Sequence, residues 1–428
     1  MNILIKSAKI INKESKYHNK NMDILIKNGT IENIAKSIKS CPKLIAKGKQ
    51  IVYKADNLHV SAGWFDLHAN FGEPGYEDQE TLSTGINAAT KGGFTGVMVM
   101  PNNKPCIDNK SMFNFIKNTV KNSIVDVIPA GNITQKGEGN QIVEMHEMHK
   151  AGCIAFTDDK KSINRNEVMK IAMLYSKDTE SIIMNFPCDK SIANNGFMNE
   201  GKTSTLLGIK GIPCLAEEIM VDRDLSLCEY TNCRLHISYI STKNSVIKIK
   251  RAKAKGIKVS TDVALYNLFL TDTEVNNFDT RYKVMPPLRT IKDKKALIKC
   301  LKEGTIDVIS TDHTPITNEL KKIEFDNAAN GIIGLESAFG LLSKHIIPQI
   351  GLDTLIDKIS TNPRKILKMK EVIIQEGEQA NFTLFNPDLE WVFNASDIES
   401  KSCNTPFIGQ KLKGKALAIL NNGKFKEC

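Results

Sequence analysis

Several features that would assign a chain to a familiar class are missing from this sequence of 428 residues. It has no run of about 18 apolar residues, and residues 1–6 lack the pattern of a secretory signal peptide, so we expect a cytoplasmic protein without membrane contact. The ten cysteines are scattered and include no Cys-x-x-Cys pair, which argues against a disulfide framework and a cysteine-ligated zinc site. No Gly-x-Ser-x-Gly motif is present, so the sequence offers no serine nucleophile elbow.

Acidic residues are in the minority, because 58 Lys and Arg face 48 Asp and Glu and give a formal net charge of +10. Such an excess points to nucleic-acid binding when the cations gather in one patch with aromatic residues among them. Here the lysines are spread among isoleucines and asparagines along the whole chain, as on solvated helix faces. We therefore expect no nucleic-acid partner.

Residues 1–58 predict a small β module. Apolar runs at 3–5, 23–27 and 30–34 predict strands, and the last two flank Asn28-Gly29. This dipeptide favours a hairpin strongly because both residues accept positive φ. The module is too small to bury much apolar surface alone, so it needs strands from elsewhere in the chain.

Residues 59–365 alternate strand-like and helical patterns, as a barrel of βα units requires. A (β/α)8 barrel takes about 250 residues, which leaves room for a second module. Eight apolar segments fit the barrel strands: 59–69, 96–101, 125–129, 153–157, 181–184, 234–238, 258–261 and 306–310. Residues 366–428 return to a β pattern, with strands expected at 380–387 and 415–420.

The most informative motif ends the first of these barrel segments. It reads Asp66-Leu67-His68-Ala69-Asn70 and is followed by a Gly/Pro turn at 72–75. It resembles the first barrel strand of dihydroorotases, of the amidohydrolase superfamily, whose usual form is Pro-Gly-x-x-Asp-x-His-x-His-x-Arg-Glu-Pro-Gly. Further segments resemble that family in the same order along nearly the whole chain: 100–103, 155–159, 236–243, 286–289, 311–315, 331–336 and 402–414.

The resemblance implies a definite architecture. The fold class is α/β, with a (β/α)8 TIM barrel of the amidohydrolase type and a small β-sandwich built from both chain ends. We accordingly predict the N-terminal part of the sandwich at 1–58, the barrel at 59–365 and the C-terminal part of the sandwich at 366–428.

The resemblance also implies a metal site at the mouth of the barrel. Three family ligands are retained, namely His68, Asp159 and Asp312. Three family histidines are replaced, by Asn70, Phe186 and Tyr239. An amide oxygen is a poor zinc ligand, a phenyl ring has no lone pair to donate, and a phenol with a pKa near 10 seldom binds zinc. The expected metal site is therefore a remnant.

Other positions bear on the same site. Of the adjacent Asp158 and Asp159, the family pattern favours Asp159 as the inward residue, although the sequence alone does not decide between them. Asn102 and His313 match family positions that contact substrate, whereas Gly72 stands where the family has an arginine that binds the substrate carboxylate.

Asp312 is the residue whose role depends most on the metal. In the family pattern the matching acid ligates metal and acts as general base, so Asp312 is the candidate catalytic residue if the protein is active. Without a metal it would be a buried carboxylate in need of a partner. We expect it to hydrogen-bond to Asn70, Tyr239 or His68.

Two functions remain open at this point. The first is a dihydroorotase-like protein of pyrimidine biosynthesis that has lost hydrolysis, binds no cofactor and assembles as a homo-oligomer or with aspartate carbamoyltransferase. The second is an active metal-dependent dihydroorotase, or another cyclic amidohydrolase, that uses a reduced site with zinc. The loss of ligands and of the carboxylate-binding arginine together favours the first.

Overall fold

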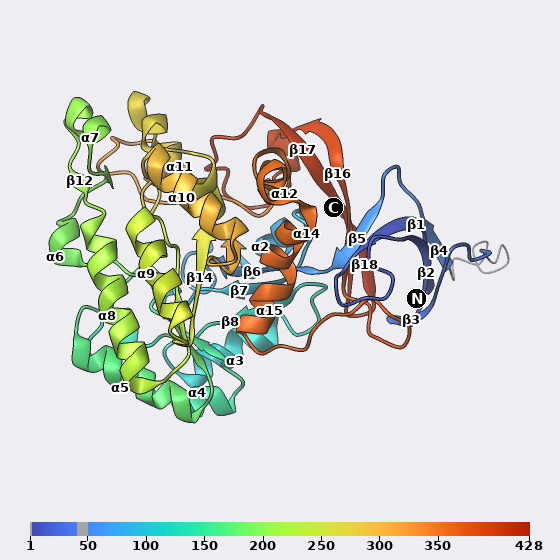
Figure 1. Cartoon of the computed structure of the whole chain (residues 1–428), viewed down its shortest axis with the longest axis horizontal. Helices are drawn as coiled ribbons and strands as arrows, with labels where there is room; N and C mark the ends of the chain where they lie inside the picture. Colours follow the sequence, from blue (N-terminus) through green and yellow to red (C-terminus); the bar gives the residue numbers. More distant parts are fainter. Residues whose placement is uncertain (1, 41–49) are drawn as a thin grey trace.

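The computed structural model describes residues 2–40 and 50–428. It consists of a barrel surrounded by helices and a curled sheet at one end (Figure 1). The predicted range 1–58 thus includes positions, residue 1 and residues 41–49, that lie outside the described residues.

Eight parallel strands among the described residues form the barrel. They are β6 (Trp64–Ala69), β7 (Phe94–Val99), β8 (Asp126–Pro129), β9 (Ala155–Phe156), β10 (Ile182–Asn185), β13 (Leu235–Ile237), β14 (Val259–Ala264) and β15 (Val308–Ser310). Parallel pairing links β6 to β8 and β9 to β15. Parallel bridges from Gly131 to Phe156 and from Ala69 to His313 close the circle. The carboxyl ends of all eight strands therefore surround one mouth.

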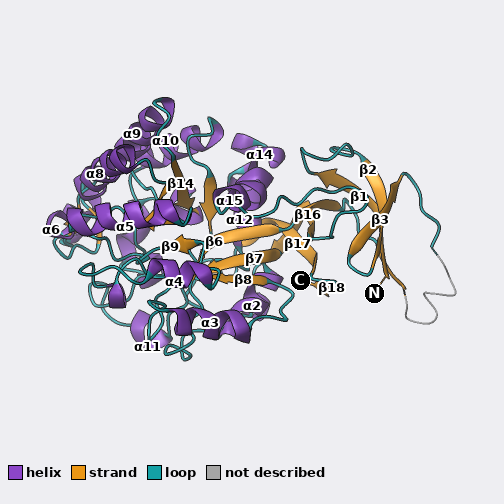
Figure 2. Ribbon diagram, turned by 90° about the horizontal axis from the view of Figure 1, so that it is seen from below, coloured by secondary structure: helices purple, strands orange, loops and turns teal. Residues whose placement is uncertain are grey.

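Helices form an outer layer around these strands (Figure 2). The longer ones are α2 (Leu82–Lys91), α3 (Lys110–Thr119), α5 (Asn166–Asp178), α8 (Leu215–Thr231), α9 (Lys243–Ala254), α10 (Ile291–Lys302) and α12 (Ala338–His345). Helix α2 illustrates how the sequence sets their ends and faces. The Thr81 hydroxyl caps its first turn by accepting from the backbone N–H of Thr84, and Ala88 and Ala89 are buried toward β7.

Shorter elements complete the barrel part. The helices are α4 (Met145–Lys150), α6 (Lys190–Ala193), α7 (Lys202–Leu207), α11 (Asn318–Lys321), α13 (Ile347–Ile350), α14 (Leu352–Ile356) and α15 (Asn362–Ile366). A small parallel pair is formed by β11 (Met198–Asn199) and β12 (Gly211–Ile212). Single helical turns are η1 (Gln135–Gly137), η2 (Leu265–Leu268), η3 (Asp272–Asn277), η4 (Thr280–Tyr282), η5 (Asp357–Thr361) and η6 (Ala395–Asp397).

The two chain ends build one sheet, as predicted for the second module. Its strands are β1 (Asn2–Ile11), β2 (Asn21–Lys27), β3 (Thr30–Ala35), β4 (Gln50–Tyr53), β5 (His59–Ala62), β16 (Phe382–Val392), β17 (Lys411–Asn421) and β18 (Lys424–Glu427). The order is β18-β17-β16-β5-β1-β2-β3, with β4 beside β1. Apolar side chains from both chain ends, such as Ile5, Ile24 and Phe382, share a single core.

Strand β5 marks a difference from the predicted boundary at residue 59. Its residues pair with β1 in parallel and with β16 in antiparallel register, so β5 belongs to the terminal sheet. The first barrel strand begins only at Trp64. All four residues of β5 are buried, and an apolar pattern cannot show which of two adjacent sheets buries them.

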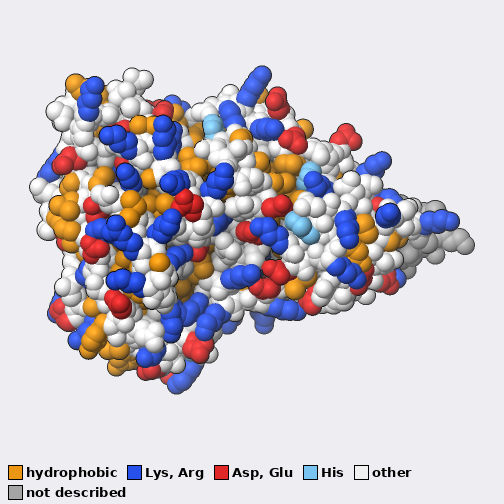
Figure 3. All heavy atoms as spheres, in the orientation of Figure 1, with side chains coloured by type: hydrophobic (Ala, Val, Ile, Leu, Met, Phe, Trp, Pro, Cys, Tyr) orange, Lys and Arg blue, Asp and Glu red, His pale blue; other side chains and the backbone are white. Residues whose placement is uncertain are grey.

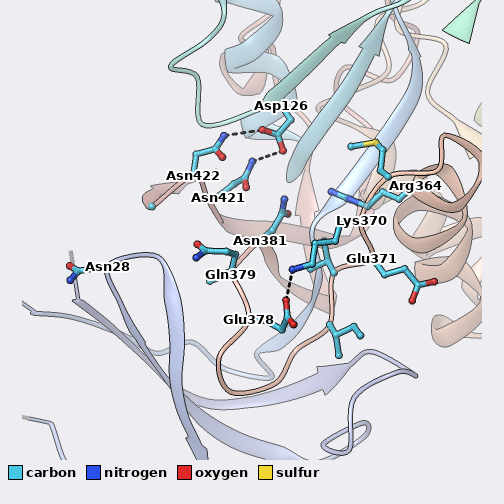
Figure 4. A pocket seen from close by; sticks show the side chains of 15 residues that line it. Asn28, Asp126, Arg364, Lys370, Glu371, Glu378, Gln379, Asn381, Asn421 and Asn422 are labelled. Carbon is cyan, nitrogen blue, oxygen red and sulfur yellow. Dashed lines mark hydrogen bonds and ion pairs between the residues drawn. The ribbon is translucent and has the colours of Figure 1, made fainter. Parts of the chain in front are cut away.

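The terminal sheet meets the amino-terminal end of the barrel, opposite the mouth. A cavity of about 520 Å³ lies at this junction (Figure 4). Several of its polar groups are already paired with one another: Asn421 and Asn422 both donate to Asp126, and Lys370 forms an ion pair with Glu378 (Figure 4). We therefore interpret these contacts as part of the interface between the barrel and the terminal sheet.

The surface agrees with the spread of charge in the sequence. Figure 3 shows Lys and Arg side chains over the whole visible face, with Asp and Glu among them. The absence of a nucleic-acid partner stays a prediction. Among the helices that the structure describes, none is both long enough and apolar enough to cross a lipid bilayer.

Candidate functional site

The retained motif residues lie where the barrel strands end. Asp159, Tyr239 and Asp312 each follow the last residue of a strand closely, and each has positive φ, at 49°, 57° and 50°. A non-glycine residue in this left-handed region is strained by about 1–2 kcal/mol. Such strain tends to cluster at functional sites. The same backbone turn, used three times, brings polar side chains to the barrel mouth.

Asp312 is paired with a lysine that the sequence analysis did not consider. The Lys160 ammonium lies 2.6 Å from Oδ1 and 2.8 Å from Oδ2 of Asp312, which is fully buried. The Tyr266 hydroxyl also donates to Asp312, and the Thr314 hydroxyl lies 3.4 Å from Oδ1. Burial raises the pKa of Asp312 to about 6, although Lys160 opposes the rise. Asp312 thus has partners, but not the three that the sequence predicted.

The pair of aspartates on the β9 loop divides as the family pattern favours. Asp158 is turned into the loop after β8, where it accepts from the backbone N–H groups of Ile133 and Thr134. Asp159 faces the mouth, where it accepts from the Asn102 amide and lies 3.4 Å from the Tyr239 hydroxyl. Asp159 is therefore the inward residue.

Phe186 and Tyr239 fill space beside these carboxylates. Both are buried, and their rings meet edge to face with centroids 6.2 Å apart. The Lys160 ammonium lies 5.1 Å from the centre of the Tyr239 ring. Burial, reinforced by the charge of Asp159, raises the pKa of Tyr239 well above its ordinary value. Tyr239 is therefore a protonated phenol, which is a poor metal ligand.

The family's metal centre does not fit this arrangement. Both oxygens of Asp312 contact Lys160, and both oxygens of Asp159 have partners in Asn102 and Tyr239. The carboxylate oxygens of Asp159 and Asp312 do not belong to the group of ligand atoms around His68. That group is completed by His236 and Asp262. The Lys160 ammonium already contacts Asp312, the acid that would bind the metal and take a proton. The predicted remnant of His68, Asp159 and Asp312 is not a joint ligand set here.

His68 instead faces two residues that the sequence analysis did not select. In the part of the chain that the structure describes, His68, His236 and Asp262 are the one group of three His, Cys, Asp or Glu residues whose ligand atoms all lie within 4.8 Å of one another. They come from β6, β13 and β14 and are completely or almost completely buried. This triad is a possible metal-binding group, and it borders the mouth through Tyr239, whose ring centroid lies 4.2 Å from that of His68 and whose backbone N–H donates to Asp262.

A cavity of about 320 Å³ opens beside the mouth. Its wall includes Asn70, Gly72 and Asn102, so three positions from the motif analysis lie on it. Asn102 donates to Asn70 at 2.8 Å, and Asn70 donates to the Thr314 hydroxyl at 3.2 Å. This polar wall is uncharged where the family pattern has an arginine, so it offers no cation there to a substrate carboxylate.

His313 does not lie on this wall. Its ring is fully buried, Nδ1 accepts from the backbone N–H of Gly334 at 3.1 Å, and Nε2 lies 3.4 Å from Oε2 of Glu80. It packs against Phe71 with ring centroids 6.3 Å apart. A role for His313 in substrate binding stays a prediction, and its observed contacts are with the protein.

One further motif in the sequence proves to be coincidental. Residues 196–203 match the phosphate-loop pattern Gly-x-x-x-x-Gly-Lys-Ser/Thr. Backbone N–H groups that would have to face a phosphate are used within the protein: Phe197 donates to Lys210, Glu200 to Ile212, and Gly201 to the Ser204 hydroxyl. The segment is therefore not a phosphate cradle.

The functional residues that sequence reasoning missed carried only weak signals. Lys160 directly follows the Asp158-Asp159 pair, and Tyr266 lies in a segment where the family pattern has histidines. His236 opens the segment at 236–243 that resembles the family, but the family's metal ligand in that segment corresponds to Tyr239. Asp262 belongs to no recognised motif. Their importance depends on which strands the barrel brings together.

Comparisons with known proteins show what the whole chain is similar to. A family model described as "Dihydro-orotase-like" matches residues 59–245. The chain is 38% identical over 427 residues to a dihydroorotase from Geobacter metallireducens, covering 99% of each chain. It is 40% identical over 407 residues to a dihydroorotase from Thermoanaerobacter sp. strain X514, covering 94% of this chain and 93% of the relative.

Solved structures extend the comparison to the fold. An L-hydantoinase (dihydropyrimidinase) from Arthrobacter aurescens superposes with a TM-score of 0.85 at 20% identity, covering 99% of this chain and 95% of the other. A D-hydantoinase gives a TM-score of 0.81 at 21% identity, with the same coverage. At this identity the likeness shows the fold alone. The predicted amidohydrolase-type barrel with a β-sandwich from both chain ends is confirmed.

Proposed function

This chain belongs to the dihydroorotase family, and from that premise we propose that it is a dihydroorotase-like protein of pyrimidine biosynthesis that does not hydrolyse dihydroorotate. Hydrolysis of a cyclic amide requires a metal that lowers the pKa of a water molecule, a base that takes its proton, and groups that hold the acidic substrate. For each of these requirements, this chain has a residue that meets it less well than the family's residue does.

The observation that carries the proposal is the ion pair between Lys160 and Asp312. The ammonium lies within 2.8 Å of both oxygens of the acid that the family uses as ligand and base. A fixed cation in this position offsets the charge of a carboxylate that has no metal, but it provides no water to activate. Phe186 and Tyr239 add bulk where the family has imidazoles.

The role that we propose for such a chain is structural, within an assembly, because that role requires no hydrolysis. The resemblance to dihydroorotases points to aspartate carbamoyltransferase as the partner, since chains of this family can support its architecture. A homo-oligomer is the other assembly that we predict. Mixing this protein with the aspartate carbamoyltransferase of the same organism, followed by sedimentation velocity, would reveal a complex heavier than either component.

An active hydrolase is the second candidate function. It is favoured by the retained Asp312 and Asn102, by the cavity of about 320 Å³ at the mouth, and by the triad around His68. In that case Lys160 would have to leave Asp312 when substrate binds. Zinc would be the expected metal.

The deciding experiment measures turnover in both directions. Purified protein, with and without added zinc or manganese, is incubated with dihydroorotate at alkaline pH and with carbamoyl aspartate at acidic pH, because ring opening and closure are favoured differently. We expect no turnover above that of the Asp312→Ala variant. Turnover by the wild type that is abolished in Asp312→Ala would establish the second function instead.

A further inference from the structure

We propose that His68, His236 and Asp262 bind one divalent metal ion of the zinc type inside the barrel, at a place that borders Tyr239 and is distinct from the Lys160–Asp312 ion pair. The side chains reach this place from three strands, β6, β13 and β14. Their exposed fractions are 1%, 0% and 0%. The site shares no carboxylate with the Lys160 ion pair.

The spacing of the ligand atoms suits a single ion. Nε2 of His236 lies 3.1 Å from Oδ1 of Asp262, and Nε2 of His68 lies 3.4 Å from the same oxygen. In a tetrahedral site with bonds of about 2.0–2.1 Å to nitrogen and oxygen, ligand atoms are about 3.3 Å apart. These two separations match those of ligands that share one metal, and the ligand atoms of the two histidines lie within 4.8 Å of each other.

An unpartnered atom points to a missing ligand. Nε2 of His68 is buried and has no hydrogen-bond partner among the described residues. A buried polar atom without a partner costs about 1–3 kcal/mol. Oδ1 of Asp262 lies 3.4 Å from this nitrogen and already accepts from the backbone N–H of Tyr239 at 2.8 Å. A cation between His68 and Asp262 would satisfy both.

Neighbouring groups hold the ligands in the orientation that a metal requires. Nδ1 of His236 lies 2.9 Å from the Ser260 hydroxyl, which leaves Nε2 directed at the site. The Ser310 hydroxyl donates to Oδ2 of Asp262 and fixes the carboxylate. Contacts of this kind, from the second nitrogen or oxygen of a ligand to a nearby group, are a regular feature of protein metal sites.

The donor chemistry selects the class of metal. Two imidazole nitrogens and one carboxylate oxygen suit zinc and its neighbours in the first transition row, whereas magnesium and calcium prefer oxygen ligands alone. A fourth position would be left for water. Because the three strands are distant in sequence and the site is buried, an ion there would bind as the barrel folds and would fasten its strands together.

The test is metal content compared between two matched variants. Asp262→Asn and Asp312→Asn make the same change at carboxylates that are both fully buried. After expression with zinc and gel filtration without chelator, we expect about one zinc per chain in the wild type and in Asp312→Asn, and little in Asp262→Asn. X-ray absorption should show only nitrogen and oxygen ligands at about 2.0–2.1 Å.

A second measurement covers the case in which Asp262→Asn fails to fold. Wild-type protein is unfolded in urea with EDTA, then refolded with zinc or with EDTA alone. We expect zinc to raise the unfolding midpoint, since an ion that binds only the folded chain stabilises it. Folded wild type that refolds in excess zinc with no bound metal would overturn the proposal. So would zinc that is retained by Asp262→Asn and lost from Asp312→Asn. Either result is independent of turnover, so the proposal can fail while the proposed function stands.

Discussion

Replacing Lys160 with methionine removes the cation from Asp312 while keeping a side chain of similar length. Asp312 is fully buried and the Lys160 side chain is 17% exposed. Removal of one partner from a buried ion pair costs about 3–5 kcal/mol, mainly because the remaining charge is left without compensation. Since Lys160 reaches solvent in part and the unpaired carboxyl can take up a proton, we expect a smaller loss, of about 2 kcal/mol at pH 7.5.

A double-mutant cycle isolates the pair. Asp312→Asn is made in the wild type and in Lys160→Met, and unfolding in urea is followed by circular dichroism and by the fluorescence of the two tryptophans. Trp64 lies in the barrel and Trp391 in the terminal sheet, so coincident transitions check that the chain unfolds as one unit. The double variant should recover most of the loss. Lys161→Met, an exposed neighbour in the same loop, serves as the control.

The free energy of unfolding should also depend on pH in a defined direction. A carboxyl whose pKa is raised by folding costs stability as pH rises from its unfolded value, near 3.8, to its folded value, and the cost is constant above that. For the wild type the plateau begins near pH 6, the pKa of Asp312. Without Lys160 that pKa is higher, so the two proteins should differ little at pH 5 and increasingly above pH 6. Equal stability at pH 7.5, or additive effects in the cycle, would refute the role of the ion pair.

The remaining predictions concern positions around the barrel. Gly72→Arg, which restores the family's arginine, should destabilise the protein by more than about 2 kcal/mol in thermal unfolding, because φ is +52° and a Cβ would lie 2.6 Å from the Tyr76 carbonyl; unchanged stability would contradict this. Asp23 is buried, but the Lys6 ammonium and two backbone N–H groups outweigh burial and lower its pKa, so Asp23→Asn should lose stability above pH 4 and approach the wild type as pH falls further. A pH-independent loss in urea unfolding would count against that account. Arg364→Met should cost about 2–4 kcal/mol, because the buried guanidinium donates to backbone carbonyls and to a threonine hydroxyl, and a smaller urea shift would show that other donors replace it.

Much of the fold could be predicted because each barrel strand is a short apolar run between helical patterns. Segments such as 96–101 and 306–310 overlap the observed β7 and β15. The exception is β5, whose apolar residues precede the first barrel strand directly and were assigned to the barrel. Both sheets bury such residues, so the assignment rests on pairing with β1 and β16, which no local pattern contains.

The site divides in the same way. That Phe186 and Asn70 cannot replace imidazoles follows from their side chains in any fold. That Asp159 faces the mouth while Asp158 turns away depends on a left-handed turn at φ 49°. The predicted hydrogen-bond partners of Asp312 were wrong, because Lys160 and Tyr266 contact it instead.

The sequence by itself determined which chemical groups the protein possesses near the ends of the predicted strands: the carboxylates of Asp158, Asp159 and Asp312, and too few imidazoles at the family positions. Only the tertiary structure decided how those charges are matched. Lys160 and Asp312 are 152 residues apart, and the closed barrel places the loops that follow β9 and β15 around the same mouth. A buried charge needs a partner that is close in space. The pairing of charges is therefore a property of the closed barrel and not of any motif.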